Sequence, residues 1–195
     1  MNLIQLKKAF YKKRVIVTGH TGFKGSWLTL WLNKLGANVL GLSLNVPTLP
    51  SFYKSTKLSN KIRSKKIDIR DLNKLSTQIN KFKPDFIFHL AAQSLVKKSL
   101  DDPIKTWETN TLGTINVLES IKKLKKKCTV VLITSDKCYK NLEINRGYKE
   151  SDVLGGKDPY SASKASAELA ISSWRASFCG ELDYQNSKIF ISSAR

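Results

Sequence analysis

The chain has 195 residues, 41% of them hydrophobic, and its 34 Lys and Arg against 15 Asp and Glu give a formal net charge of +19. This length and apolar content suit one domain with a hydrophobic core and exclude an intrinsically disordered chain. No stretch reaches the roughly 20 apolar residues of a membrane helix. The first residues lack the charged, apolar and small-residue regions of a secretory signal.

Most of the positive charge comes from lysine, with the densest run at residues 122–127. A basic surface can bind nucleic acid, an anionic membrane or an acidic small molecule, or it can reflect only the composition bias of the source genome. Because the run falls at a predicted helix end and contains no aromatic residue, we expect no nucleic acid and no membrane as partner. The cysteines lack metal-ligand spacing, which predicts free thiols, a cytoplasmic location and no metal site. They are Cys128, Cys138 and Cys179.

Strands and helices are predicted to alternate along the chain. Continuous apolar runs, typical of strands buried on both faces of a parallel sheet, lie at residues 15–17, 86–88, 130–133 and 189–191, with weaker candidates at 38–42 and 66–69. Helical periodicity covers residues 26–35, 72–82, 104–121 and 158–178. The alternation predicts an α/β fold, a Rossmann-like doubly wound parallel sheet with right-handed crossovers. We expect one domain over residues 1–195, with 1–12 as a short N-terminal extension and 140–158 as the longest loop.

Specific residues support the helix boundaries. Asp71 is a suitable N-cap, Asp158-Pro159 suits a helix start, and Gly36 suits a C-cap. The first helix carries an apolar stripe of Trp27, Leu28, Trp31 and Leu35. The third is expected to be one long helix traced by Ile104, Trp107, Thr111, Leu112, Ile115, Leu118 and Ile121.

Residues 18–25, TGHTGFKG, lie between the first predicted strand and a helix. Gly19, Gly22 and Gly25 are spaced so that the chain can turn tightly, approach a pyrophosphate and pack helix on strand. The helix N-terminus would face the phosphates with unpaired N–H groups. A merely structural turn is the alternative, but the strand–turn–helix context favours a dinucleotide.

The glycine spacing resembles that of the short-chain dehydrogenase/reductase family. The resemblance implies that Asp68, at the end of the third strand, and the Ile69 backbone meet the adenine, and that Asn110 helps to order the active site. The second strand ends with neither the acid that favours NAD nor the arginine that favours NADP, so NAD is implied by the resemblance alone. The implied cofactor-binding residues are Gly19, Thr21, Gly22, Phe23, Lys24, Gly25, Asp68, Ile69, Leu90, Ala91, Ala92, Asn110, Tyr160 and Lys164.

Tyr160 and Lys164 lie four residues apart at a helix start, hence on one face. An ammonium group beside a phenol favours its ionised form, so the tyrosine can take a proton from a sugar hydroxyl near neutral pH. Such pairs also arise by chance. With Ser135 just past the fifth predicted strand, however, this pair resembles the Ser–Tyr–Lys arrangement of the family.

Asp136 and Lys137 follow Ser135 directly. Sugar-nucleotide 4,6-dehydratases need an acid and a base side by side here because they remove water across two neighbouring carbons. The pair resembles that of the subgroup acting on CDP-glucose, with lysine where other subgroups have glutamate; an ordinary surface ion pair is the alternative. The resemblance implies that Tyr160, aided by Lys164 and Ser135, deprotonates the C4 hydroxyl. Lys137 as a neutral amine would then remove the C5 proton while Asp136 protonates the departing C6 hydroxyl.

The resemblance runs from about residue 10 to the end and implies a role in deoxysugar and O-antigen biosynthesis. An epimerase or reductase of the same family follows if Asp136-Lys137 is incidental. A silent dinucleotide- or nucleic-acid-binding fragment is a third possibility. The family's fold continues into a lobe that carries most sugar-nucleotide contacts, so we expect a truncated chain holding the cofactor half. Its helices at roughly 101–126 and 159–178 resemble those that pair subunits into a homodimer.

Overall fold

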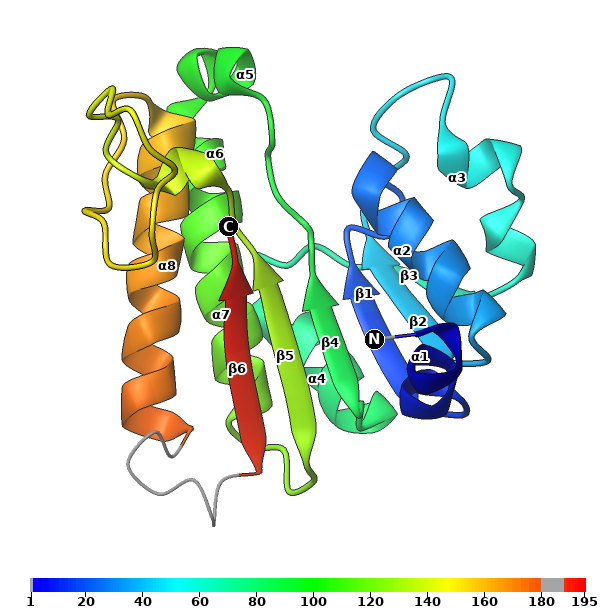
Figure 1. Ribbon diagram of the computed structural model, residues 1–195. Coiled ribbons are helices and arrows are strands. Elements are labelled where there is room, and N and C mark those ends of the chain that lie inside the picture. Colours follow the sequence, from blue (N-terminus) through cyan, green and yellow to red (C-terminus); the bar gives the residue numbers. More distant parts are fainter. Residues whose placement is uncertain (1, 180–187) are drawn as a thin grey trace.

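The computed structural model describes residues 2–179 and 188–195. Its centre is a six-stranded parallel sheet with the strand order β3-β2-β1-β4-β5-β6 (Figure 1). The strands are β1 Arg14–Thr18, β2 Asn38–Ser43, β3 Arg63–Lys66, β4 Phe86–His89, β5 Cys128–Ile133 and β6 Ile189–Ala194. The order reverses between β1 and β4, and doubly wound sheets bind ligands at the carboxyl ends of strands beside such a switch point. The predicted Rossmann-like α/β fold is confirmed.

Helices cover both faces of this sheet (Figure 1). α1 (Leu3–Phe10) and α2 (Phe23–Lys34) lie on one face, and α4 (Leu72–Phe82), α7 (Gly113–Ile121) and α8 (Pro159–Phe178) lie on the other. The shorter elements are α3 Phe52–Ser55, η1 Leu58–Asn60, α5 Val96–Asp101, α6 Pro103–Trp107, the π-turn η2 Glu108–Leu112 and η3 Asp136–Cys138. Among the helices of the described ranges, none is long and apolar enough to cross a bilayer.

The central strands are buried on both faces, as their continuous apolar runs predicted. In β1, Ile16 packs into the larger core cluster beneath α4, α7 and α8, while Val15 and Val17 pack into the smaller one beneath α2. All three are 0% exposed. The carboxyl ends of β1 and β4 are therefore held rigidly where a ligand would bind.

The predicted helix boundaries are confirmed at three caps. Asp71 accepts the N–H of Lys74 (3.0 Å), and Asp158 accepts the N–H of Ser161 (3.0 Å). Gly36 follows α2 with a φ of +82°, the left-handed conformation that glycine adopts easily. The three free cysteines are all buried, as free thiols were expected.

The apolar stripe predicted for α2 was right for Leu28, which packs against the core, and for the buried Leu35, but wrong for the two tryptophans. The helix begins at Phe23 rather than at residue 26, and it buries Gly25, Ser26, Thr29 and Leu32. Trp27 and Trp31 are about half exposed, at 52% and 50%. Trp27 stacks instead on Phe52 of α3, with ring centroids 4.0 Å apart. Small residues face the sheet because α2 must approach β1 closely at the glycine turn.

The third strand was also predicted too late in the chain. β3 covers residues 63–66, all of them exposed, and its apolar successors Ile67 and Ile69 lie beyond it. An edge strand needs no apolar side chains to form its ladder, so the periodicity placed the strand on the buried residues that follow. Asp68 is consequently in a loop, not at a strand end.

Residues 104–121 do not form one uninterrupted α-helix. The π-turn η2 separates α6 from α7, and the amide of Gly113 reaches the carbonyl of Glu108, five residues back. The predicted stripe changes face at this turn: Ile104 is 73% exposed, whereas Leu118 is fully buried. The expected N-terminal extension contains α1, and Phe10 at its end packs against Phe86 of β4 in a tilted arrangement, with ring centroids 5.0 Å apart.

Candidate active site

Two of the three glycines in the turn between β1 and α2 are needed for the packing of the chain itself. Gly19 has a φ of +72°, and a Cβ there would lie 2.7 Å from the backbone nitrogen of Ala91, just after β4. A Cβ on Gly25 would collide with the carbonyl oxygen of Gly19. These glycines therefore bring β1, α2 and the end of β4 into direct backbone contact.

Gly22 has a different role. Its φ of −75° suits any residue, and a Cβ there would meet only the carbonyl oxygen of Gly19, at 3.4 Å. As the N-cap of α2 it also offers no side-chain acceptor to the first-turn N–H groups of Phe23, Lys24 and Gly25. Open space beside free donors at a helix N-terminus fits the pyrophosphate of a dinucleotide.

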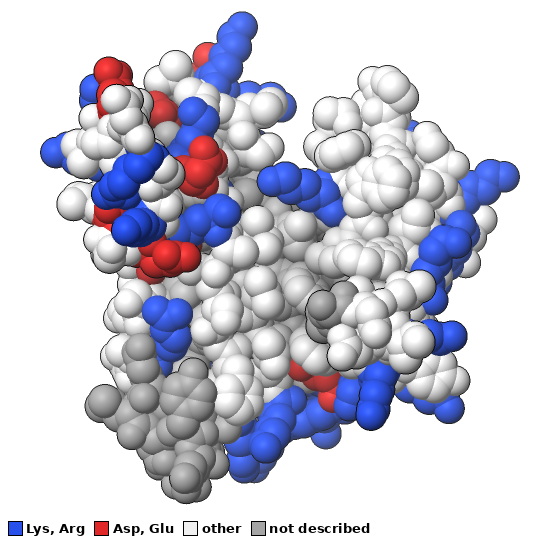
Figure 2. Space-filling model, viewed as in Figure 1, with Lys and Arg blue, Asp and Glu red and all other residues white. Residues whose placement is uncertain are grey.

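The space-filling view shows a hollow above the carboxyl ends of the strands (Figure 2). It lies between the part of the molecule that carries α3 and the part that carries α5, and most of its floor is made of uncharged side chains. A cofactor lying across the switch point of the sheet would occupy this hollow.

Thr21 joins the glycine turn to the end of β2. Its hydroxyl donates to the carbonyl oxygen of Asn45 (3.1 Å) and lies 2.7 Å from the hydroxyl of Ser43. Since the single proton of Thr21 is used for Asn45, Ser43 donates to Thr21. The observed contacts of Thr21 thus hold the turn against β2.

Asp68, expected at the adenine, already has a cationic partner. Arg70 donates to both of its carboxylate oxygens, at 2.7 Å and 3.2 Å, and this pairing lowers the pKa of Asp68. Arg70 also donates to Glu108 in the π-turn (2.9 Å). Next to Asp68, the Ile69 side chain occupies the space that a Cβ on Gly113 would need. The sequence prediction contained Asp68 but not this ion-paired cluster.

The edge that follows β4 is fixed from β1. The backbone N–H groups of Leu90 and Ala91 both donate to the hydroxyl of Thr18, at 3.2 Å each. Leu90, Ala91 and Ala92 are partly buried. The two small side chains at this edge leave room for a ligand to lie close to the backbone.

The fold brings Ser135, Tyr160 and Lys164 to the same end of the sheet. Ser135 follows β5 and is the N-cap of η3, which packs against α8. Tyr160 and Lys164 lie one turn apart at the start of α8 and are 8% and 5% exposed. The Lys164 ammonium donates to the carbonyl oxygen of Ile133 at the end of β5 (3.4 Å).

The electrostatic surroundings of Lys164 favour a readily shared proton. Burial lowers the pKa of Lys164 to about 8, although the Glu168 carboxylate acts in the opposite direction. The charge of Lys24, in the first turn of α2, adds to the effect of burial. The positive charges of Lys24 and Lys164 therefore repel each other, although the two residues lie in different helices.

Ser135 also organises the adjacent acid and base. Its hydroxyl donates to Oδ1 of Asp136 (3.0 Å) and accepts the N–H of Lys137 (3.2 Å). Both residues thus lie on one short 3-10 turn beside the serine. Both side chains are exposed.

Asn110 connects the π-turn to the neighbourhood of Tyr160. Its side chain accepts the N–H of Gln93 (2.8 Å) and donates to the Gln93 carbonyl (2.9 Å). It also donates to the hydroxyl of Ser163 (3.0 Å), which in turn donates to the carbonyl oxygen of Tyr160 (2.7 Å). These contacts join the π-turn to the first turn of α8.

Sequence reasoning missed Glu168, which lies one turn beyond Lys164 and is 3% exposed. Its carboxylate accepts hydrogen bonds from Thr134, Ser193 and Arg195. It therefore ties α8 to the ends of β5 and β6 behind the catalytic candidates. The four-residue spacing from Lys164 was visible in the sequence, but glutamates are rarely buried, and nothing in the sequence marked this one.

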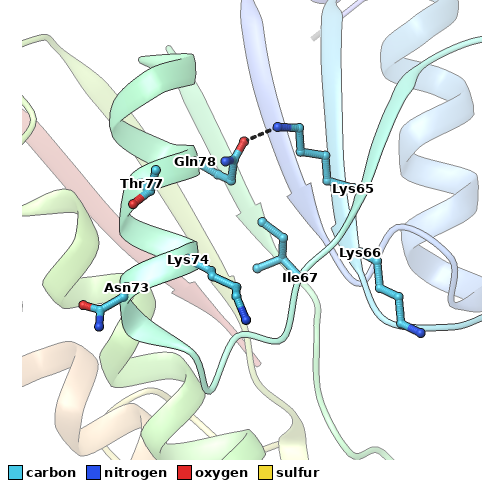
Figure 3. Close-up of a pocket in the computed structure, with 7 residues that line it drawn as sticks. All are labelled: Lys65, Lys66, Ile67, Asn73, Lys74, Thr77 and Gln78. Atoms are coloured by element: carbon cyan, nitrogen blue, oxygen red, sulfur yellow. Dashed lines mark hydrogen bonds between the residues drawn. The ribbon is translucent and has the colours of Figure 1, made fainter.

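A separate pocket lies between β3 and α4 (Figure 3). Figure 3 shows Lys65 of β3 bonded to Gln78 of α4, at 2.6 Å. The lining residues are Lys65, Lys66, Ile67, Asn73, Lys74, Thr77 and Gln78, none of them a predicted site residue. In residues 2–179 and 188–195, no group of three His, Cys, Asp or Glu side chains is arranged to hold a metal ion.

The chain belongs to the GDP-mannose 4,6 dehydratase family, whose model matches residues 16–189. It is 48% identical over 191 residues to the CDP-glucose 4,6-dehydratase of Salmonella typhimurium, covering 97% of this chain and 53% of that protein. It is 30% identical to the CDP-paratose 2-epimerase of Salmonella typhi, covering 80% of this chain and 51% of that protein. The chain thus spans about half the length of these curated relatives.

Solved structures agree with this assignment. An epimerase of Methanothermobacter thermautotrophicus superposes with a TM-score of 0.81 at 28% identity, covering 98% of this chain and 53% of that one. The UDP-glucose 4-epimerase of Thermus thermophilus, solved in complex with NAD, gives a TM-score of 0.73 at 28% identity, covering 85% and 51%. The family resemblance inferred from the glycine turn and the Ser–Tyr–Lys residues is confirmed.

Proposed function

We propose that the whole protein is an NAD-dependent CDP-glucose 4,6-dehydratase, a lyase that converts CDP-glucose into CDP-4-dehydro-6-deoxyglucose. The observation that carries the proposal is the position of Asp136 and Lys137 on one turn with Ser135, at the same end of the sheet as Tyr160 and Lys164. The 48% identical relative, which bears this name, supports it.

NAD is proposed as the cofactor because the residues present fit a dinucleotide. Gly22 leaves open space at the uncapped N-terminus of α2, and the small edge at Ala91 and Ala92 lies across the switch point. A structural relative at 28% identity was solved with NAD. When bound, the nicotinamide supplies the acceptor and donor of a hydride.

In the first step, Tyr160 takes the proton of the C4 hydroxyl of the sugar. The buried Lys164 ammonium stabilises the negative charge that passes from the oxygen of Tyr160 to the sugar oxygen, and the hydroxyl of Ser135 orients the oxygen that loses the proton. With its pKa lowered to about 8, Lys164 still carries its proton at neutral pH but shares it readily. The C4 alcohol becomes a ketone in this step.

The ketone acidifies the hydrogen on C5, which permits the elimination of water. Lys137, as the neutral amine, takes the C5 proton, and the electron pair of the C5–H bond forms the C5–C6 double bond. The C6–O bond breaks, and Asp136 gives its proton to the departing hydroxyl. A hydride at C6 and a proton at C5 complete the product, and the nicotinamide would supply that hydride. Ser135 holds both groups in place by its bonds to Asp136 and to the Lys137 amide.

We also propose a cytoplasmic homodimer that acts on a nucleotide sugar and takes part in deoxysugar biosynthesis. Exposed apolar side chains on the described helices α6 and α8, such as Ile104 (73%) and Leu169 (62%), support a dimer face. The free, buried cysteines support a reducing compartment.

The decisive experiment compares Tyr160→Phe with Lys137→Ala in protein expressed from the complete reading frame. Tyr160→Phe should stop every step. Lys137→Ala should still oxidise C4, while water loss slows by roughly 10²-fold, as expected for removal of a general base. Nicotinamide absorbance and solvent deuterium exchange at C5 report the two steps separately.

Lys140→Ala is the matched control, because Lys140 is an exposed lysine three residues further along the same loop. It should behave as the wild type. Loss of water at the native rate in Lys137→Ala would remove the basis of the proposal. A wild-type product that is an epimer and retains its C6 oxygen would assign an epimerase instead.

A further inference from the structure

His89 is the last residue of β4 and is almost completely buried, at 3% exposure. Two threonines contact its ring. Nδ1 lies 2.7 Å from the hydroxyl of Thr18 at the end of β1, and Nε2 lies 3.2 Å from the hydroxyl of Thr114 in α7. The imidazole therefore bridges the sheet and the helix directly behind the hollow.

The neighbours of Thr18 and Thr114 determine where the protons lie. The Thr18 hydroxyl oxygen accepts the N–H of Ala91 and shares the N–H of Leu90 with the backbone carbonyl oxygen of Thr18. The Thr114 hydroxyl uses its proton for the carbonyl oxygen of Asn110 (2.7 Å), so it can only accept from Nε2 of His89, and the proton of Thr18 points at Nδ1. An imidazole that accepts at Nδ1 carries its proton on Nε2, so His89 donates to Thr114.

The chain of hydrogen bonds continues into the π-turn. The hydroxyl of Thr114 donates to the backbone carbonyl oxygen of Asn110 (2.7 Å). The Asn110 side chain donates to Ser163, and Ser163 donates to the carbonyl oxygen of Tyr160. The Asn110 side chain donates to the Gln93 carbonyl as well, so this residue joins the edge after β4, the π-turn and the first turn of α8.

A charged imidazole is incompatible with this arrangement. A proton on Nδ1 would face the Thr18 hydroxyl oxygen, which already accepts the N–H of Ala91 and part of the N–H of Leu90. Burial lowers the pKa of His89 to about 3, and the positive charge of Lys164 in α8 acts in the same direction. His89 thus stays neutral throughout the physiological pH range.

We propose that His89 is a positioning residue of the active site, held as the Nε2–H form. It couples the backbone edge at Leu90 and Ala91, which borders the dinucleotide site, to Asn110 and to the first turn of α8, which carries Tyr160. Its consequence for catalysis rests on the proposed function, because the geometry that it maintains is that of hydride transfer between the sugar and the cofactor.

The first test needs no variant. In the ¹⁵N-labelled chain, the ring nitrogens of His89 should show one fixed Nε2–H tautomer that does not titrate between pH 8 and pH 5. His89 is told apart from His20 by its nuclear Overhauser contact with Thr18. An Nδ1–H tautomer, or titration near the ordinary histidine value of 6.5, would overturn the inference whatever the chain binds.

The second test compares Thr114→Val with Thr114→Ser. Valine matches threonine in shape but neither accepts from His89 nor donates to Asn110, whereas serine keeps both bonds. In Thr114→Val the fixed tautomer should be lost. In protein from the complete reading frame, kcat for C4 oxidation should fall ~10-fold with KM within ~2-fold, since a positioning group acts in the transition state.

Thr114→Ser should restore both the tautomer and kcat. Equal kcat in Thr114→Val and the wild type would overturn the positioning role. Failure of the wild-type chain to bind NAD in calorimetry would instead overturn the proposed function, while leaving the tautomer result to stand by itself. If Thr114→Val does not fold, the wild-type spectrum still decides.

Discussion

At the scale of single residues, the three glycines of the turn have different roles. Two are required by the packing of the chain, and one leaves space for a ligand. Gly19 and Gly25 have no room for a Cβ because backbone atoms of Ala91 and Gly19 lie against them. Gly22 has ordinary backbone angles and an almost open Cβ position. A side chain at Gly22 would therefore disturb only what binds beside α2.

This difference predicts opposite outcomes for two substitutions. Gly22→Leu should leave the free energy of unfolding within about 1 kcal/mol of the wild type, yet weaken NAD binding by at least ~100-fold because the side chain fills the pyrophosphate site. Gly25→Ala should lower the free energy of unfolding, because a Cβ there would collide with the carbonyl oxygen of Gly19. Calorimetric titration with NAD and urea unfolding measure the two effects.

Gly147→Leu is a suitable control, since a Cβ at this exposed loop glycine meets nothing within 4 Å. It should retain both stability and NAD binding. Unchanged NAD affinity in Gly22→Leu would rule out the turn as the pyrophosphate site.

Single residues also show what the sequence could and could not predict about the site. Tyr160, Lys164 and Ser135 lie at the same end of the sheet because their positions follow from strand ends and helix starts. The partners of site residues were not predictable. Arg70 also binds Glu108 of the π-turn, and Glu168 accepts from Ser193 and Arg195, only because segments far apart in the sequence meet in the fold.

At the scale of elements, apolar spacing located the helices better than it located their buried faces. The tryptophans of α2 are large and correctly spaced, yet Gly25, Ser26 and Thr29 face the sheet. Close backbone approach at a ligand-binding turn requires small side chains, so the largest apolar residues point outward. A hydrophobic stripe indicates contact with something apolar, but not which neighbour provides it.

The outward-facing residues of α6, η2 and α8 lead to a prediction about assembly. Ile104, Leu112 and Leu169 are 73%, 53% and 62% exposed, which is costly in water unless a second copy covers them. The protein from the complete reading frame should sediment as a dimer at tens of micromolar, roughly the range where specific interfaces are occupied.

Leu169→Glu should shift that protein to monomer, because a pair of carboxylates would be buried against each other. Leu49→Glu is the matched control, since Leu49 is 71% exposed but lies far from these helices in the loop before α3. A wild-type monomer, or equal dissociation by both variants, would contradict the proposed dimer face.

At the scale of the whole molecule, both histidines of the chain are buried in the neutral form. Burial lowers the pKa of His20 to about 4 and that of His89 to about 3. The unfolded chain, whose histidines titrate at 6.5, binds more protons below that pH than the folded one. Stability is therefore full above pH 6.5 and is lost as the pH falls toward 4.

Each histidine should remove on the order of 3 kcal/mol from the free energy of unfolding by pH 4. Urea unfolding at pH 7, 5.5 and 4.5 measures the slope. The carboxylates with lowered pKa, among them Asp68, add to the loss only below about their ordinary value of 3.8. Constant stability between pH 7 and pH 4.5 would show that the two rings are not held neutral.

The order of strands and helices was predictable because alternating strand and helix patterns permit few topologies. The departures share one physical cause. The conformations of edge strand β3 and of the π-turn η2 depend on contacts with neighbouring elements. Those neighbours come from distant parts of the sequence, so no local sequence pattern indicates them.

The π-turn has a consequence for how this helix tolerates change in length. A segment whose hydrogen bonds reach five residues back holds one more residue than an α-helix between the same two ends. Deleting one residue from 108–112 would convert the π-turn into regular α-helical turns. The residues of α6 and α7 would keep their present orientation. The same deletion within α7 would rotate its buried face by about 100°. A one-residue deletion in the π-turn would therefore remove the position that Asn110 occupies and leave the buried face of α7 in place.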